Sequence, residues 1–159
     1  MNLAIRPAQP DDAPLVCAFI RELAEYERLL DDCVATPETV AGTLFASQPR
    51  VFCDIAEAGG EPAGFVLWFY SYSTFQAKHG IYLEDLYVRP PFRGRGIGKA
   101  LLGHLAKRAV EEECGRFEWS VLDWNAPSIA FYESLGAKPV AGWTRYRLDG
   151  EALQILGAG

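Results

Sequence analysis

The stretch Arg93-Gly94-Arg95-Gly96-Ile97-Gly98-Lys99 is the strongest indication of the fold in this 159-residue sequence. It follows an apolar run over Ile81–Val88 that predicts a strand, and it opens a helical pattern that reaches about Glu113. A glycine-rich turn between a strand and a helix presents backbone N–H groups at the positive end of the helix dipole. The stretch therefore predicts a phosphate-binding loop.

The spacing of this loop excludes two common nucleotide-binding motifs. A dinucleotide fingerprint would need a glycine where Lys99 stands. A P-loop would need a glycine at Arg93 and a serine or threonine at Ala100. What remains is the pattern R-x-x-G-x-G, and on spacing alone a glycine-rich helix entry without a ligand stays open as the alternative.

The composition of the whole chain narrows the class of protein. Half of the residues are hydrophobic, which predicts one globular domain over residues 1–159. The formal net charge is -6 and there is no run of Lys or Arg, so nucleic acid is not an expected partner. The four cysteines show neither zinc spacing nor a disulfide framework, and we expect no metal. Without a signal core or a membrane-length apolar run, the expected location is cytoplasmic, with no membrane partner.

The remaining patterns predict an α/β domain with a mixed sheet and helices on both of its faces. Helices are expected after the caps Asp11–Asp12, Thr36 and Asn125 and after the glycine loop, and Gly136 is expected to end the last one. The predicted strands are Leu3–Arg6, Val51–Glu57, Ala63–Tyr70, Ile81–Val88 and Phe117–Leu122, with one or two more around Ala137–Val140 and Thr144–Asp149.

Acidic side chains stand where secondary structure does not favour them. Glu84 and Asp85 lie in mid-strand, where acidic residues are rare, and strand alternation predicts that they face opposite sides. A second cluster flanks Tyr26 at the end of the first predicted helix, against the helix dipole, and consists of Glu25, Glu27, Asp31 and Asp32. Cation binding or proton transfer is one interpretation of these groups; a strand edge and a helix face in contact with solvent are the alternatives.

Tyr132 and His79 are further candidates for chemistry. Tyr132 follows Phe131 on a predicted helix, about 100° away, so that one ring can pack while the other faces a cleft. A tyrosine that only packs stays open as the alternative. His79 falls in the segment Ser71–Gly80, which we expect to be irregular, and is the weaker candidate.

Taken together, these features resemble the GNAT family of N-acetyltransferases. The residues that carry the resemblance are Leu86-Tyr87-Val88, the loop Arg93–Gly98, and Asn125 with Phe131–Ala137. Within that family the chain is most similar to the spermidine/spermine (diamine) N-acetyltransferases, through Arg21–Glu27, Tyr82–Asp85, Trp124–Tyr132 and Gly142-Trp143.

The resemblance implies a mostly antiparallel mixed sheet of six to seven strands and acetyl-CoA as the co-substrate. It implies acetyl transfer to a primary amine of a polyamine or a lysine-like amino acid, in a homodimer. A protein N-acetyltransferase and a non-catalytic acyl-CoA-binding module are the alternatives. Glu133-Ser134-Leu135 departs from the family, because diamine members carry basic residues there.

The resemblance also assigns roles to individual residues. Tyr132 would be the general acid, and Glu84 would take or relay the proton of the amine. Acetyl-CoA would be held by Leu86, Tyr87, Val88, Arg93, Gly94, Arg95, Gly96, Ile97, Gly98, Lys99, Asn125, Pro127 and Ser128. The amine would be held by Tyr26, Glu27, Glu84 and Asp85.

Overall fold

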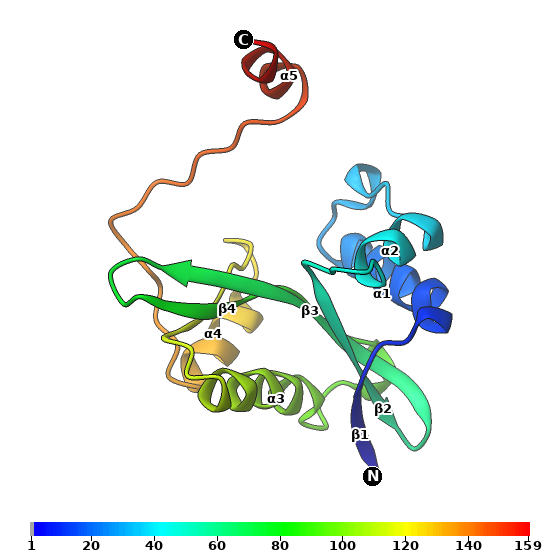
Figure 1. The fold of residues 1–159 in the computed structure, drawn as a ribbon. Helices are drawn as coiled ribbons and strands as arrows, with labels where there is room; N and C mark the ends of the chain where they lie inside the picture. Colours follow the sequence, from blue (N-terminus) through cyan, green and yellow to red (C-terminus); the bar gives the residue numbers. More distant parts are fainter. Residues whose placement is uncertain (1) are drawn as a thin grey trace. The chain divides into compact units, whose positions relative to one another are not determined.

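A computed structural model describes residues 2–159, and its coordinates form two compact units that meet in sequence between Leu122 and Asp123. The first unit is built on a five-stranded sheet in which the strands lie side by side in chain order (Figure 1). All neighbours are antiparallel except β4 and β5, which run parallel. The strands are β1 Leu3–Pro7, β2 Phe52–Ala58, β3 Glu61–Ser73, β4 Lys78–Val88 and β5 Phe117–Trp119.

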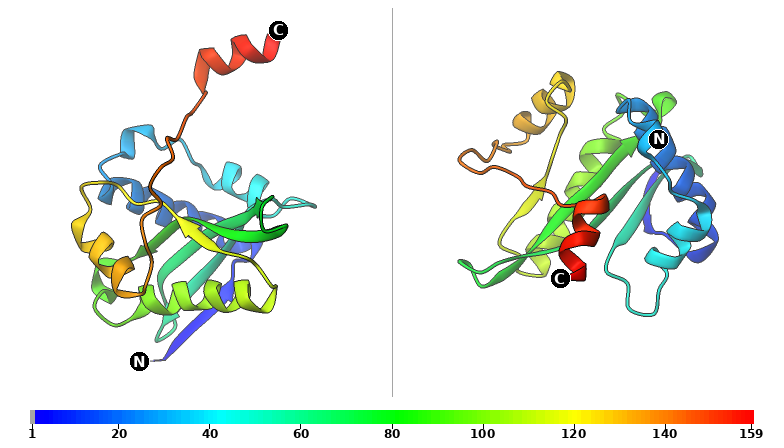
Figure 2. Two further views of the ribbon diagram at one scale, coloured as in Figure 1. Left: turned by 90° about the vertical axis from the view of Figure 1, so that its left-hand side faces the viewer. Right: turned by 90° about the horizontal axis from the view of Figure 1, so that it is seen from above.

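Helices cover both faces of this sheet (Figure 2). Helices α1 Ala13–Tyr26 and α2 Pro37–Leu44 lie on one face, and helix α3 Ile97–Glu111 lies on the other. Three short 3₁₀ turns complete the unit: η1 Pro10–Asp12, η2 Leu30–Asp32 and η3 Pro90–Phe92. The mixed, mostly antiparallel sheet with helices on both faces confirms the predicted class.

Side chains on the two faces of β3 pack against different helices. The Phe65 ring stacks on Phe19 of α1 at 5.2 Å between ring centroids, and both side chains are fully buried. The Trp68 ring, on the opposite face, lies 5.1 Å below the Arg108 guanidinium of α3. Full burial of a side chain such as Phe19 contributes about 2 kcal/mol to the free energy of unfolding, so this double-sided core holds β3 at the centre of the sheet.

The predicted side-chain cap at Thr36 is confirmed, whereas the one at Asp11–Asp12 is wrong. The Asp12 carboxylate accepts from the preceding Gln9 backbone N–H at 2.7 Å, and no side chain caps α1. The Thr36 hydroxyl accepts from the backbone N–H of Thr39 at 3.1 Å, and the Thr39 hydroxyl accepts from the backbone N–H of Thr36 at 2.9 Å. This reciprocal pair satisfies two N–H groups that α2 cannot satisfy itself. Helix α1 ends at Tyr26, and the chain turns away just after it, at Arg28, with a φ of 63°.

The hairpin of β3 and β4 is longer than predicted. Pairing continues to Ser73 and Lys78, so the expectation of an irregular segment over Ser71–Gly80 is wrong. The polar and aromatic residues of this segment form regular strands because each strand satisfies the backbone of the other. His79 is a strand residue opposite Tyr72, and its ring lies 5.1 Å from the Tyr72 ring.

The second unit holds helix α4 Ala126–Ser134 and helix α5 Gly150–Ala158. The Asn125 side chain caps α4 by accepting from the Ser128 N–H at 3.3 Å, and Gly136 follows its end with a φ of 91°, both as predicted. The prediction of one or two strands between residues 137 and 149 is wrong, and the count of six to seven strands is not confirmed. Within this unit those residues have no strand to pair with, and a strand without a partner leaves its backbone groups unsatisfied.

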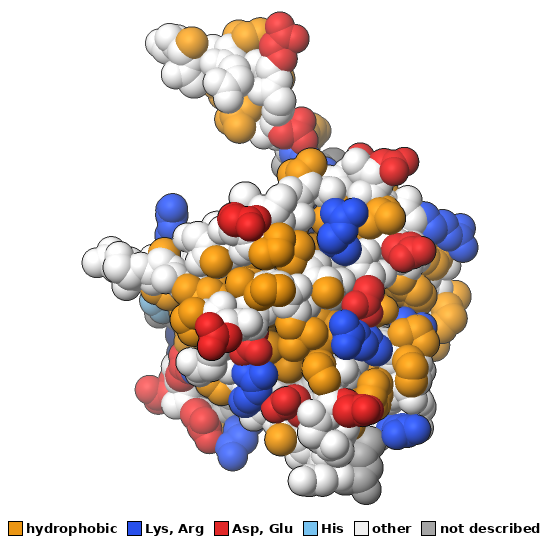
Figure 3. All heavy atoms as spheres, turned by 90° about the vertical axis from the view of Figure 1, so that its right-hand side faces the viewer, with side chains coloured by type: hydrophobic (Ala, Val, Ile, Leu, Met, Phe, Trp, Pro, Cys, Tyr) orange, Lys and Arg blue, Asp and Glu red, His pale blue; other side chains and the backbone are white. Residues whose placement is uncertain are grey.

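The distribution of charged side chains on the surface agrees with the absence of Lys or Arg runs in the sequence. On the face shown in Figure 3, acidic and basic side chains are interspersed among hydrophobic ones rather than gathered into areas of one sign. No helix within residues 2–159 combines the length and the apolar content needed to cross a bilayer.

Candidate active site

The glycine loop enters helix α3 through two left-handed residues. Gly94 has a φ of 77° and Gly96, which caps the helix, has a φ of 79°. A side chain at either position would be strained, so glycine is required by the backbone itself. No side chain caps this helix end, and the first backbone N–H groups of α3 have no partner within the helix. The predicted loop-to-helix geometry is confirmed, and it fits an anionic group.

An ion pair that the sequence did not reveal fixes the strand end before this loop. The Arg89 Nε and Nη2 donate to the two carboxylate oxygens of Glu22 on α1, at 3.0 and 2.9 Å. The Tyr87 hydroxyl donates to the same carboxylate at 3.3 Å. A bidentate pair fixes both distance and orientation, so it ties the end of β4 to α1. Glu22 is one of several charged residues on α1, and nothing in the sequence distinguishes it.

Arg93 turns back onto the strand instead of pointing outward from the loop. Its Nε donates to the Val88 carbonyl oxygen at 2.8 Å. Its guanidinium lies 5.2 Å from the ring centre of Tyr26 and 5.7 Å from that of Tyr87. Arg93 therefore brings the end of α1 beside the loop by cation–π contact. A carbonyl oxygen has two lone pairs, so Val88 can still accept a second hydrogen bond.

Strand β4 is open along half of one edge. Strand β5 pairs with it from Ile81 to Leu83, and within residues 2–159 no strand continues that pairing along Glu84–Val88. The other edge of this part of β4 is paired with β3. Unpaired N–H and C=O groups on a sheet edge bind extended ligands by adding them as a further strand. Leu86, Tyr87 and Val88, predicted to hold the cofactor arm, lie on this segment.

A β-bulge rearranges the acidic residues of β4. Pairing shifts between Leu67 and Trp68 of β3, so that Asp85 lies opposite Leu67, Leu83 lies opposite Trp68, and Glu84 is the extra residue. Asp85 faces the α1 side together with Tyr87, two residues further along.

Glu84 also faces the α1 side of the sheet, as the alternation of side chains from the start of β4 shows. Tyr82 is paired and stacked with Phe69, which alternates with Trp68 and therefore also faces the α1 side. Two residues on, Glu84 continues that side up to the bulge. The prediction that Glu84 and Asp85 face opposite sides is wrong, because one extra residue interrupts the alternation.

Three carboxyl groups consequently gather at the end of α1. Burial, with the charges of Glu84 and Glu27, raises the pKa of Asp85 to about 7. Burial and the charge of Glu84 raise the pKa of Glu27. Tyr26, which is 40% exposed, is adjacent to Glu27 at the helix end. A bound cation would relieve the mutual repulsion of these groups, so the arrangement favours an ammonium ligand.

The second unit holds the other predicted site residues. Asn125 is buried as the cap of α4, with Pro127 and Ser128 in the first turn of the helix. Tyr132 is half-buried on α4, and its ring centre is 5.6 Å from that of Phe131. These residues are described within their own unit, and their approach to the glycine loop and to Glu84 stays a prediction.

A metal centre has no counterpart in the part of the chain that is described. Residues 2–159 contain no group of three or more His, Cys, Asp or Glu side chains arranged to hold a metal ion.

Comparisons with known proteins agree with this geometry. Residues 16–137 match the model of the acetyltransferase (GNAT) family. The chain is 37% identical to a thialysine N-epsilon-acetyltransferase of Sus scrofa, over 98% of this chain and 97% of that protein. It is 36% identical to an L-ornithine N5-acetyltransferase of Arabidopsis thaliana, over 96% of this chain and 86% of that one.

Solved structures share the fold. An integron cassette protein from the mobile metagenome of V. cholerae superposes with a TM-score of 0.84 at 25% identity, over 100% of this chain and 99% of that one. The family model and the two relatives extend through the glycine loop, the bulged strand and the Asn125–Tyr132 segment. The chain therefore belongs to the acetyltransferase (GNAT) family.

Proposed function

We propose that this protein transfers the acetyl group of acetyl-CoA to a primary amine of a small cationic molecule, a polyamine or a lysine-like amino acid. The observation that carries the proposal is the cluster of Glu27, Glu84 and Asp85 beside the open edge of β4. The names of the thialysine and ornithine acetyltransferases support the same class of acceptor.

The residues of the first unit fit the co-substrate. The free amides from Gly94 to Lys99 would hold its pyrophosphate, and Leu86 and Val88 would hold the pantetheine arm along the edge of β4. Asn125, with Pro127 and Ser128 beside it, would contact the same arm. When bound, acetyl-CoA supplies an acyl group activated as a thioester.

Glu84 and Tyr132 would perform the proton transfers. An alkylamine has a pKa of about 10.4 and is mostly protonated at neutral pH, so a base must take its proton before the nitrogen can attack. We assign that proton to a carboxylate oxygen of Glu84, directly or through water. The Tyr132 hydroxyl would give its proton to the departing thiolate, whose pKa is close to the 8.5 of a cysteine thiol. Holding both reactants together supplies much of the acceleration.

Two other functions compete with this proposal. A protein N-acetyltransferase would need room for a polypeptide, whereas three carboxyl groups at one point suit a small, multiply charged amine. A non-catalytic acyl-CoA-binding module would keep the loop and the open edge but would have no use for Tyr132 as an acid. Turnover distinguishes all three.

The experiment is acetyl-CoA turnover with spermidine, putrescine, thialysine, ornithine and lysine as acceptors. We expect acetylation of at least one of these amines, with a lower rate on a lysine-containing peptide. Binding of acetyl-CoA without acetylation of any amine would refute the enzymatic function.

Tyr132→Phe tests the acid. We expect kcat to fall by about two orders of magnitude while KM for the amine changes little, because the hydroxyl acts on the leaving group. Tyr146→Phe, on an exposed residue of the same unit, is the matched control and should keep the wild-type kcat. An unchanged kcat in Tyr132→Phe would remove Tyr132 from the mechanism.

Glu84→Gln tests the carboxylate. We expect loss of kcat/KM, greatest for the acceptors that carry the most positive charge, because the variant removes both a base and a negative charge. Glu118→Gln on the neighbouring strand β5 should have little effect. An equal loss across all acceptors would contradict the role of Glu84 in binding the cation.

We also propose a cytoplasmic homodimer. All four cysteines are free thiols, the state expected in a reducing compartment, which supports that location. Light scattering coupled to size-exclusion chromatography would measure the subunit number, and a mass equal to one chain would refute the dimer.

A further inference from the structure

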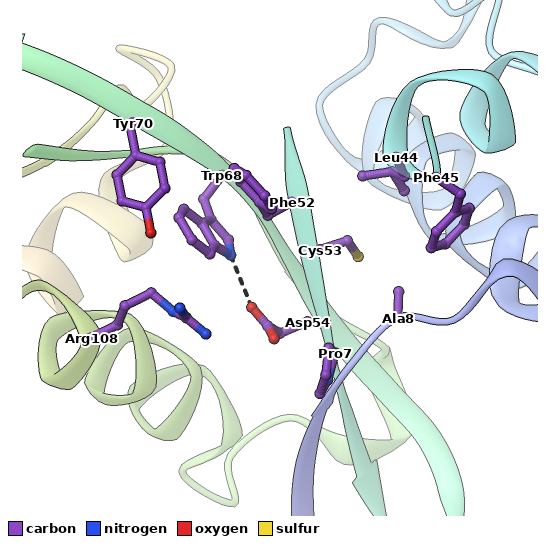
Figure 4. A pocket seen from close by; sticks show the side chains of 10 residues that line it. All are labelled: Pro7, Ala8, Leu44, Phe45, Phe52, Cys53, Asp54, Trp68, Tyr70 and Arg108. Atoms are coloured by element: carbon purple, nitrogen blue, oxygen red, sulfur yellow. Dashed lines mark hydrogen bonds between the residues drawn. The ribbon is translucent and has the colours of Figure 1, made fainter. Parts of the chain in front are cut away.

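A pocket lies in the first unit between the end of α2 and helix α3, apart from the residues assigned to acetyl transfer (Figure 4). Its volume is about 200 Å³, more than the roughly 150 Å³ cavity that is sufficient to bind benzene. It opens where β1 ends and β2 begins. Its lining residues are Pro7, Ala8, Leu44, Phe45, Phe52, Cys53, Asp54, Trp68, Tyr70 and Arg108.

Opposite charges face one another across this pocket. The carboxylate of Asp54 and the guanidinium of Arg108 point toward each other in Figure 4. Among the ion pairs of residues 2–159 there is none between them, so their charged atoms are more than 4.0 Å apart. Asp54 is 3% exposed, and one of its oxygens accepts from the Trp68 indole N–H at 2.9 Å. Its other oxygen lies 3.6 Å from the Nε2 of His104.

Arg108 keeps hydrogen-bonding capacity and its charge. One of its N–H groups donates to Glu112 at 3.1 Å, while its buried Nε donates to no acceptor. Burial disfavours the charged form, but the hydrogen bond to Glu112 and the charge of Asp54 outweigh this and raise the pKa of Arg108. An unsatisfied donor next to a cavity indicates space for an acceptor.

The rest of the wall is apolar and aromatic. The rings of Phe52 and Trp68 stack at 4.8 Å, and Tyr70 meets Trp68 edge to face at 5.1 Å. Leu44 and Phe45 of the α2 end close the opposite side. A ligand that carries a single charge would be repelled by either Asp54 or Arg108, because the pocket is lined by one negative and one positive side chain. A zwitterion can satisfy both.

We propose that this pocket is a second ligand site, which binds a small zwitterion with an apolar side chain, such as an apolar α-amino acid. The ammonium group donates to Asp54, the carboxylate accepts from Arg108, and the side chain contacts Phe45 and Phe52. The site shares no lining residue with the glycine loop or with the three carboxyl groups, so the inference is independent of the proposed acetyl transfer.

Binding is tested on the whole 159-residue chain with L-valine as the probe. The Trp68 indole N–H resonance, assigned by its loss in Trp68→Phe, reports directly on the hydrogen bond to Asp54. We expect a saturable shift of this resonance with valine, and binding at least about tenfold weaker for isovalerate and isobutylamine, which each lack one charged group.

Variants separate this site from the site of acetyl transfer. Asp54→Asn and Arg108→Gln should each abolish the response to valine, whereas Lys107→Gln on the exposed face of α3 and Glu84→Gln should keep it. If Arg108→Gln does not fold, Arg108→Lys keeps the positive charge without the planar donors and should weaken binding at least about fivefold.

Three results would overturn the proposal. One is a Trp68 resonance that does not move with valine. Another is an equal response to isovalerate and isobutylamine. The third is a response that survives Asp54→Asn and Arg108→Lys, or is lost in Glu84→Gln, which would mean that the amino acid binds elsewhere.

Discussion

Replacement of Asp85 by asparagine makes a quantitative test of the acidic cluster. In the folded chain, burial and the charges of Glu84 and Glu27 raise the pKa of Asp85 from 3.8 to about 7. In the unfolded chain the group returns to about 3.9. Between these two values the folded chain holds a proton that the unfolded chain has released. The free energy of unfolding therefore falls as the pH rises through this window.

The magnitude follows from the size of the shift. Each pKa unit corresponds to about 1.36 kcal/mol, so a shift of about three units removes about 4 kcal/mol between pH 4 and pH 7. Below the window Asp85 is protonated in both states, and above it the group is ionised in both, so the slope vanishes. Asparagine cannot ionise and has no such slope. The free energy of unfolding of Asp85→Asn minus that of the wild type should rise by about 4 kcal/mol across the window.

Urea unfolding followed by circular dichroism, repeated from about pH 4 to about pH 8, measures this difference. Asp31→Asn, on an exposed turn residue, is the control that removes a carboxylate outside the cluster. Glu27→Gln should reduce the pH-dependent part, because it removes one of the charges that act on Asp85. A difference for Asp85→Asn that varies by less than about 1 kcal/mol over the window would refute the arrangement of the cluster.

Other perturbations test the ion pair, the glycine loop and the acidic cluster that form the site. Glu22→Gln should lower the free energy of unfolding by about 2 kcal/mol and raise KM for acetyl-CoA, because Arg89 loses a charged partner; a wild-type urea midpoint would argue against it. Gly96→Ala should cost about 1 kcal/mol through its left-handed backbone and weaken binding of coenzyme A, as measured by calorimetry. Gly42→Ala, inside a helix with open space around it, should be neutral or stabilising. KM for the amine should fall as the pH rises through about 7, since ionised Asp85 attracts the cation; a flat profile would contradict this.

Local signals predicted most of the first unit and the start of α4 in the second unit correctly. The glycine loop, the cap at Thr36 and the cap at Asn125 depend on residues within a few positions of each other. These features can therefore be predicted from a few neighbouring residues. The resulting elements agree with the predicted ones to within a few residues, except at the long hairpin of β3 and β4.

Features that depend on pairing between distant residues escaped prediction. The bulge at Glu84 exists through its pairing with β3, and the ion pair of Glu22 with Arg89 joins residues 67 positions apart. In the segment after α4 the error was of the opposite kind, because a strand was predicted that does not form. Its alternation between Thr144 and Asp149 has the period of a strand, but a strand forms only where another supplies hydrogen bonds. Helix α5, which satisfies its own backbone, begins directly after it.

The bulge adds one carboxylate to the α1 side of β4 and leaves every other side chain of the strand on its regular face. Deletion of Glu84 would remove the extra residue and restore simple alternation along the strand. Leu83 would stay opposite Trp68 and Asp85 would stay opposite Leu67, because these two pairs already flank the extra residue. A gene that lost this one codon would therefore encode the same sheet, with two carboxyl groups at the end of α1 instead of three.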